Sequence, residues 1–240
     1  GWHGRGAMGR GFADPLCGSG TLLIEAGLVA RDVAPGLARR RWGFDFWKGH
    51  DPQLWARLIQ EAKDRKQAGA ARDVVIWGSD IDPELVALAR QNVSAAGLDG
   101  TVEVREQDVA EAGPPPGPAG VLVTNPPYGN RIGDADEVAV LMGVLGDVLR
   151  RRYMGWSAWI LVGSPVQARA LGLRPAARHV VWNGPLDARL LEVPIRSKAP
   201  EGRGPGWRDR RAPAEGAVLE VTGLDDPLLA LLPMDDEPAG

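Results

Sequence analysis

The sequence lacks the features that mark secreted, metal-binding and membrane proteins. Only one of its 240 residues is a cysteine, Cys17, so no internal disulfide can form, and no Cys/His cluster has the spacing of metal ligands. No apolar run reaches the roughly 18 residues of a membrane span, and the first residues lack the basic and then apolar plan of a signal peptide. These absences predict a cytoplasmic protein with no disulfide, no metal and no membrane contact.

An excess of positive charge is also missing, because the formal net charge is −3. Since nucleic-acid binding depends on neutralising phosphates, this charge argues against a protein that grips RNA or DNA over its whole surface. Any such contact must be local. The candidate clusters are Arg39, Arg40 and Arg41 beside Trp42; Arg150, Arg151 and Arg152; and Arg208, Arg210 and Arg211 near Trp207. A solvated surface explains each cluster equally well, and a helix end also suits the Arg150 cluster.

The length and the 44% hydrophobic content fit one α/β domain with a large core. Apolar patterns predict strands at 12–14, 73–78, 102–104, 120–124 and 156–162, and helices at 21–31, 52–67, 83–96 and 138–151. A closing antiparallel hairpin is expected from 180–182 and 190–195 around Asn183 and Gly184. Strands that alternate with helices indicate a mostly parallel sheet covered by helices on both faces.

Two segments depart from this regular order. Residues 32–51 are rich in Arg, Trp, Gly and Pro without a clean period, so we interpret about 32–72 as an insertion. After Ile195 the composition becomes that of a linker. The prediction is a catalytic-type domain over residues 1–196, followed by a Pro/Gly/Arg-rich linker and tail over 197–240.

The most informative motif is Asn125-Pro126-Pro127-Tyr128, which follows an apolar strand. Two prolines fix φ and remove two backbone donors, which turns the local carbonyls into outward acceptors. The Asn125 side chain adds an amide and Tyr128 adds an aromatic face. Such a tip suits a flat base that carries an amino group, although a turn that merely ends a strand is the plain alternative.

A second motif lies upstream, at Asp14-Pro15-Leu16-Cys17-Gly18-Ser19-Gly20-Thr21. Its glycines allow a tight strand-to-helix turn whose backbone approaches a ligand closely. Asp80 stands one strand further along the chain. The combination favours a nucleotide-like cofactor over an ordinary turn.

Together the two motifs resemble those of amino-group methyltransferases that use S-adenosylmethionine. With Ala34-Pro35-Gly36-Leu37 and Trp42-Gly43-Phe44-Asp45, the resemblance is to bacterial 23S rRNA guanine-N2 methyltransferases, over about residues 10–196. It implies a Rossmann-like class I fold with a mostly parallel seven-stranded sheet. It also implies S-adenosylmethionine as cofactor, RNA as partner, and a THUMP-type RNA-binding domain upstream, missing from a chain that would be N-terminally truncated.

The resemblance also implies roles for individual residues. Asp14 would lie near the cofactor's amino group, Asp80 would accept from its ribose hydroxyls, and Asp108 would accept from its adenine amino group. Asp82 would cap the next helix instead. The full cofactor-binding set is Asp14, Cys17, Gly18, Ser19, Gly20, Asp80, Ile81, Asp108, Val109 and Asn125.

The catalytic set implied by the resemblance is Asn125, Pro126, Pro127 and Tyr128. The Asn125 side-chain oxygen and the Pro126 carbonyl would hold the two amino hydrogens, while Tyr128 would stack on the base. Trp42, Phe44 and Trp47 are expected to pack the insertion against the sheet, with a wall at the substrate entrance as the alternative. Rival functions are methylation of tRNA guanine, of DNA adenine or of protein glutamine, or an inactive RNA-binding module left by truncation.

Overall fold

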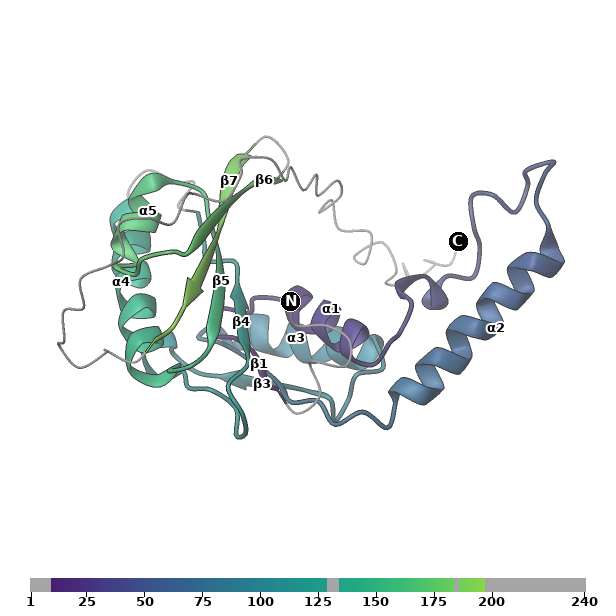
Figure 1. The fold of residues 1–240 in the computed structure, drawn as a ribbon, viewed down its shortest axis with the longest axis horizontal. Coiled ribbons are helices and arrows are strands. Elements are labelled where there is room, and N and C mark those ends of the chain that lie inside the picture. The colour runs from purple at the N-terminus through teal and green to yellow at the C-terminus, as the bar shows by residue number, and fades with distance from the viewer. Residues whose placement is uncertain (1–9, 129–133, 184–185, 197–240) are drawn as a thin grey trace, which may run out of the picture.

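The computed structural model describes residues 10–128, 134–183 and 186–196, which form a seven-stranded sheet with helices on both faces (Figure 1). The strands are β1 (Phe12–Asp14), β2 (Ile76–Asp80), β3 (Val102–Glu106), β4 (Val121–Thr124), β5 (Ser157–Val162), β6 (Ala177–Asn183) and β7 (Leu186–Pro194). Their order is β3-β2-β1-β4-β5-β7-β6. The first five are parallel, and β7 pairs antiparallel with both β5 and β6. The predicted fold class is confirmed.

The helices are α1 (Thr21–Ala30), α2 (Pro52–Gly69), α3 (Pro83–Ala95), α4 (Asp134–Arg152) and α5 (Pro165–Ala170), with 3-10 turns η2 (Pro35–Ala38) and η3 (Val109–Glu111). Three of the helices begin in the same way. Asp51, Asp82 and Ser164 accept hydrogen bonds from the first free amides of α2, α3 and α5, and a proline follows each cap. Proline fits there because its missing N–H has no partner in the first turn.

Two hydrophobic clusters hold the helices to opposite faces of the sheet. On one face α1 and α3 contribute Leu23 and Val86, which are buried with Ile76 of β2. On the other face α4 contributes Met142 and Leu145, which are buried with the central strands β4 and β5. The sheet is therefore the middle layer of three, as Figure 1 shows.

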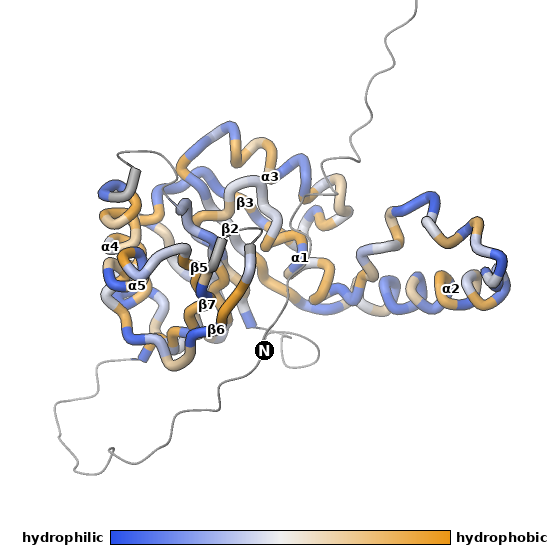
Figure 2. Tube along the Cα trace, turned by 90° about the horizontal axis from the view of Figure 1, so that it is seen from above, coloured by the Kyte–Doolittle hydropathy of each residue, from blue (hydrophilic) through white to orange (hydrophobic). Residues whose placement is uncertain are grey.

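The insertion forms a projecting arm, defined here as residues 32–72, which contains η2 and α2 and stands clear of the sheet (Figures 1 and 2). At its base the Asp32 carboxylate pairs with Arg65 at 2.5 Å and with Arg72 at 3.3 Å. Gly69 is the only fully buried residue of α2. The arm therefore adds little to the core.

The expectation that the insertion's aromatic residues pack against the sheet was wrong. Trp42 and Phe44 both contact Trp55 of α2, with ring centroids 4.8 Å apart in each pair. Trp47 in turn meets Phe44 edge-on at 6.4 Å. These rings pack on one another and on α2, because the arm carries them away from the sheet.

Other differences are smaller. The second strand covers Ile76–Asp80 instead of 73–78, and α5 was not predicted. The antiparallel hairpin is confirmed for β6 and β7. Residues 197–240, with the expected linker and the Arg208 cluster, lie outside the described residues. Within the described ranges, no helix is long and apolar enough to cross a membrane.

Candidate active site

The sequence motifs meet at one edge of the sheet, where three neighbouring strands end. Asp14 is the last residue of β1, Asp80 is the last residue of β2, and Asn125 directly follows β4. β1 lies between the other two, with Asp14 in register with Gly78. From β1 the chain continues to β2 and β3 on one side of the sheet, and it later returns to β4 on the other side of β1. The order of the strands therefore reverses beside β1, and α/β sheets bind ligands at such a switch point.

The glycine loop between β1 and α1 is held from two sides. Gly18 and Gly20 have φ values of +52° and +87°, a region that favours glycine. The Gly18 amide donates to Asp80 Oδ2 at 2.9 Å, and the Asn92 side chain of α3 donates to the Ser19 carbonyl at 3.0 Å. A Cβ at Gly20 would also come within 3.2 Å of the Ala89 side chain. The loop is therefore fixed against β2 and α3.

Asp80 joins the ends of the second strand and the glycine loop. Its Oδ1 accepts from the Asp82 amide at 3.1 Å while Oδ2 accepts from Gly18. Asp82 itself accepts from the Glu84 amide at 2.8 Å and caps α3, as predicted. Each carboxylate oxygen of Asp80 keeps further lone-pair capacity. Asp80 can thus accept additional hydrogen bonds from a ligand.

Asp14 is 2% exposed, which is rare for a carboxyl group. Burial raises its pKa to about 7; the Thr124 hydroxyl and the Leu16 amide counteract this, and the Asp80 carboxylate adds to it. The Leu16 amide donates to Asp14 at 3.2 Å, whereas Thr124 lies beside the carboxyl without a full hydrogen bond. Among the described residues no cation acts on this carboxyl. A positively charged group that entered the site would favour its ionised form.

The loop's cysteine is chemically quiet. Cys17 is buried, and burial, followed by the nearby Asp14 and Asp80 carboxylates, raises the pKa of its thiol to about 12. The thiol therefore stays protonated at neutral pH, and a protonated thiol is a poor nucleophile. Its backbone contributes by donating to the Ser79 carbonyl at 2.9 Å.

The tip after β4 is closed by its own side chains. The Tyr128 hydroxyl donates to Asn125 Oδ1 at 2.6 Å. An amide oxygen has two lone pairs, so Oδ1 can still accept from one more donor. Tyr128 thus holds the Asn125 amide in place, a role that the sequence did not indicate.

Gln167 supports this tip from α5 and was missed by the sequence analysis. Its side chain is 5% exposed; Nε2 donates to the Pro127 carbonyl at 3.0 Å, and Oε1 accepts from the Gly163 amide at 2.7 Å. A Cβ at Gly163 would come within 2.8 Å of the Tyr128 ring, so glycine makes room for that ring. Only the Ser164-Pro165 helix start hints at α5 in the sequence, and nothing there points to Gln167.

The remaining predicted cofactor residues lie beside this edge, with varied environments. Asp108 caps η3, since its Oδ1 accepts from the Ala110 amide at 2.8 Å. The Ile81 side chain is 64% exposed directly after β2. Val109 is buried in the core, so any contact it makes with a ligand would involve its backbone.

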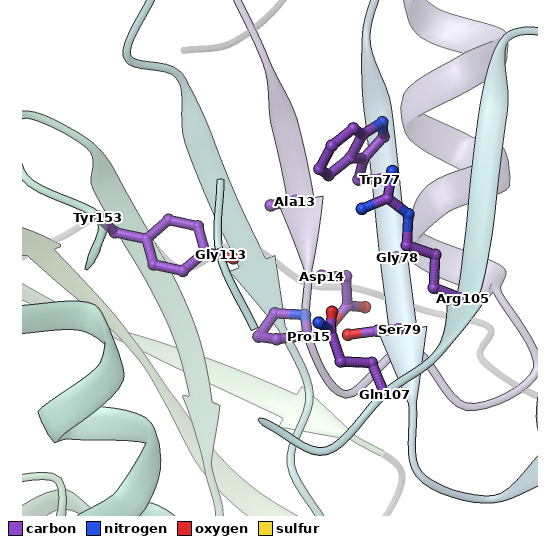
Figure 3. Close-up of a pocket in the computed structure, with 10 residues that line it drawn as sticks. All are labelled: Ala13, Asp14, Pro15, Trp77, Gly78, Ser79, Arg105, Gln107, Gly113 and Tyr153. Atoms are coloured by element: carbon purple, nitrogen blue, oxygen red, sulfur yellow. The ribbon is translucent and has the colours of Figure 1, made fainter. Parts of the chain in front are cut away.

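A shallow pocket borders the site on one face of the sheet (Figure 3). Asp14, Ser79 and Gln107 lie close together in it, and the Arg105 guanidinium stacks over the Trp77 ring at 3.5 Å. The pocket includes neither Asp80 nor Asn125. It flanks the site that the motifs form and does not coincide with it.

The two described arginine clusters differ. Arg150 donates to the Gly172 carbonyl at 3.2 Å and Arg152 donates to the Ala112 carbonyl at 3.1 Å, so these two arginines fasten α4 to its surroundings. In the arm, the Arg39 guanidinium lies 5.8 Å from the Trp42 ring, and Arg40 and Arg41 are exposed. The arginines of the arm are exposed, as is Arg151 of α4, whose side chain is 77% exposed.

Comparison with known proteins agrees with this geometry. Residues 5–192 match a family described as RMKL-like, methyltransferase domain. A relative from Pseudomonas paraeruginosa, named ribosomal RNA large subunit methyltransferase K/L, is 40% identical over 231 residues, which make up 93% of this chain and 32% of the relative. The chain thus spans about a third of the length of such relatives.

Two solved structures share the architecture. A "possible methylase" from Clostridium difficile superimposes with a TM-score of 0.73 at 31% identity, covering 81% of this chain and 50% of that one. A methyltransferase solved as a complex with SAH has a TM-score of 0.69 at 28% identity, covering 80% of this chain and 49% of that one. With the matching family model, the strand order, and the two motifs and Asp80 at one edge, the chain belongs to the RMKL-like methyltransferase domain family.

Proposed function

We propose that this domain transfers the methyl group of S-adenosylmethionine to the exocyclic amino group (N2) of guanine in RNA, with 23S rRNA as the substrate. The observation that carries the proposal is the meeting of the glycine loop, Asp80 and the Asn125 tip at the ends of β1, β2 and β4. The name of the relatives supports an RNA substrate from the large ribosomal subunit.

The residues at this edge fit the cofactor. Asp14 is a buried carboxyl without a cation among the described residues, and the cofactor's amino group would supply that charge. Asp80 has lone pairs left for the ribose hydroxyls. Asp108 would accept from the adenine amino group, and the exposed Ile81 side chain would lie against the ring. Bound there, the cofactor supplies an electrophilic methyl group on a positively charged sulfur.

The tip would orient the amino group of the base. The Pro126 carbonyl would be the backbone acceptor, since Gln167 already donates to the Pro127 carbonyl, and Asn125 Oδ1 keeps one lone pair beside Tyr128. Two acceptors that hold both amino hydrogens would withdraw the nitrogen lone pair from conjugation with the ring and direct it at the methyl group. They also favour the positive charge that develops on nitrogen. Positioning and oriented dipoles thus supply the rate, without a covalent intermediate.

A guanine in a paired stem must leave its stack first, which costs on the order of a few kcal/mol, and the Tyr128 ring would replace part of that stacking. The proposal extends to the partners of the whole protein. Relatives three times as long have room for the THUMP-type RNA-binding domain that we propose as a companion. An rRNA substrate would place the protein in the cytoplasm.

The test is replacement of Asn125 by Ala. Single-turnover transfer of labelled methyl to 23S rRNA fragments should fall by about two orders of magnitude or more, as for the loss of one preorganised hydrogen bond. Cofactor affinity should stay within a few-fold. Tyr128→Phe is the matched variant: it keeps the ring, removes the hydroxyl that donates to Asn125 at 2.6 Å, and should lose less activity.

Mass spectrometry of the labelled nucleoside identifies the acceptor base. A near-parental rate in Asn125→Ala would refute the role of the amide. Label on adenine instead of guanine would refute the substrate assignment while leaving the cofactor site intact.

A further inference from the structure

The arm ends in a loop, residues 39–51, that is ordered by its own aromatic rings. Trp55 of α2 is the hub, contacted by Trp42 and Phe44 at 4.8 Å each. The Trp42 amide donates to Asp45 at 2.9 Å, and the Trp47 amide donates to the Phe44 carbonyl at 3.0 Å. The loop is therefore a built surface held on α2, away from the sheet (Figures 1 and 2).

Two further aromatic rings on this loop are left in solvent. The Phe46 side chain is 88% exposed and Trp47 is 71% exposed. They are the most exposed large apolar side chains in the described part of the chain. Exposing two adjacent aromatic rings on a folded loop is costly unless something stacks on them.

Positive charge is concentrated in the same loop. Residues 33–51 contain four cations, Arg39, Arg40, Arg41 and Lys48, and two acids, Asp45 and Asp51. Both acids accept hydrogen bonds from backbone amides of the loop and of α2. The loop is thus basic on a chain whose net charge is −3.

We propose that this loop is an RNA-binding surface that takes unpaired nucleotides. Phe46 and Trp47 stack on bases, and Arg40, Arg41 and Lys48 contact the phosphates. Aromatic rings beside cations are the combination that binds single-stranded nucleic acid, because every base offers a flat face and every linkage a charge. The inference rests on the proposed function and adds where on the molecule the RNA substrate is held, outside the methyl-transfer site.

A protein partner is the rival occupant, because Leu54 and Leu58 of α2 are also about half exposed. The charge decides between the two. A protein-docking core is usually poor in charged groups, whereas here three arginines and a lysine belong to the same loop as the rings. A duplex is disfavoured as well, because stacked base pairs offer no free faces to Phe46 and Trp47.

The experiment measures fluorescence anisotropy of the 240-residue protein with two RNA probes. One is a single strand of about 16 nucleotides, the upper footprint of a single-strand binding module. The other is a perfectly paired hairpin of the same length. The variants are Phe46→Ala with Trp47→Ala, and Arg40→Ala with Arg41→Ala. Trp182→Ala and Arg151→Ala are the matched controls, on β6 and α4 at the far end of the molecule (Figure 1).

The aromatic pair should weaken single-strand binding by about tenfold or more and change hairpin binding little. The arginine pair should weaken both and lower the salt slope for the single strand by roughly 0.7 per lost phosphate contact. The controls should match the parent. Parental affinity in the aromatic pair, an equal loss in Trp182→Ala, or no RNA binding by the parent would overturn the proposal.

Methyl transfer separates this inference from the proposed function. With saturating RNA, the arm variants should keep the parental single-turnover rate and the parental cofactor affinity. Only the RNA concentration that gives half the maximal rate should rise. If the loop binds RNA but no guanine is methylated, the proposed function is wrong and the proposed RNA-binding surface is retained. If guanine is methylated and the RNA concentration at half-saturation is unchanged in every arm variant, the proposed RNA-binding surface is wrong and the proposed function is retained.

Discussion

At the residue scale, the polar groups of the site are already engaged with one another. Asp80 holds the glycine loop, and Tyr128 holds the Asn125 amide. The motifs in the sequence, through their resemblance to a known family, drew attention to these groups, but they gave no sign of Asn92 and Gln167. Those two act across 73 and 40 residues of chain, on the Ser19 and Pro127 carbonyls. A backbone carbonyl leaves no trace in the sequence, so such partners become visible only in the folded chain.

Asp14 should make stability depend on pH. Its folded-state pKa of about 7 lies above the ordinary value of 3.8, so the native chain keeps the Asp14 proton up to a higher pH than the unfolded chain does. The burial cost is absent below about pH 4 and complete above about pH 7, and stability falls as pH rises between them. The effect is on the order of a few kcal/mol.

Urea unfolding of the parent and of Asp14→Asn at about pH 4.5 and pH 7.5 measures this effect. Asn cannot ionise, so the parent should lose stability relative to the variant as pH rises. A difference that stays constant over this range would mean that Asp14 is ionised throughout.

Asp80→Asn should weaken cofactor binding by roughly 1.5–3 kcal/mol, as expected for hydrogen bonds to a charged acceptor. Asn keeps one oxygen for the loop, so the fold should survive. Asp82→Asn is the control, since Asn also caps helices and Asp82 is predicted to have no contact with the cofactor. Isothermal calorimetry with S-adenosylmethionine measures both affinities. If the two variants bind the cofactor equally well, the assignment of the ribose contact to Asp80 is wrong.

At the element scale, strong patterns were predictable and short or register-dependent features were not. The helix at 83–96 and the strand at 156–162 agree closely with α3 and β5. Val74 and Val75 favoured an earlier second strand, but pairing sets its start, because Phe12 of β1 lies opposite Ile76. The six residues of α5 are too few to show a helical period.

Packing of α4 against the segment after α5 gives a prediction on two glycines of one helix. A Cβ at Gly146 would collide with the Leu171 backbone oxygen, whereas the nearest atom to a Cβ at Gly143 is the Ala170 oxygen at 3.8 Å. Gly146→Ala should therefore destabilise the fold by about 1–3 kcal/mol. Gly143→Ala should be neutral or stabilising by up to about 1 kcal/mol, because alanine favours helix.

Urea unfolding of the two variants beside the parent checks this pair. Equal effects would show that helix propensity outweighs the contact with Leu171. Loss of the cooperative transition in Gly146→Ala alone would show that the contact is stronger than expected.

At the scale of the whole molecule, local stability should divide between the sheet and the arm. In α2 only Gly69 is fully buried, whereas Leu122 of β4 and Ile160 of β5 are 0% exposed. Elements with few buried contacts open without global unfolding. Amides of α2 should exchange with deuterium roughly a hundredfold faster than those of β4, a difference of about 2.7 kcal/mol in opening free energy.

α3 is the control for this measurement, because it is also a helix but packs Val86, Ala89 and Val93 into the core. The protected amides of α3 should exchange with deuterium as slowly as those of the sheet. Protection of α2 equal to that of α3 would mean that the arm unfolds only with the whole domain.

The place of β1 in the sheet has a consequence for biosynthesis. β1 is made before the other strands of this sheet, yet it ends up in the sheet between β2 and β4, with Phe12 opposite both Ile76 and Val121. Until residue 124 has been made, one edge of β1 has no strand to pair with, and open edges invite pairing with other chains. The nascent protein therefore passes through a vulnerable interval of more than a hundred codons. A chaperone that holds the first strand during translation would shorten that exposure.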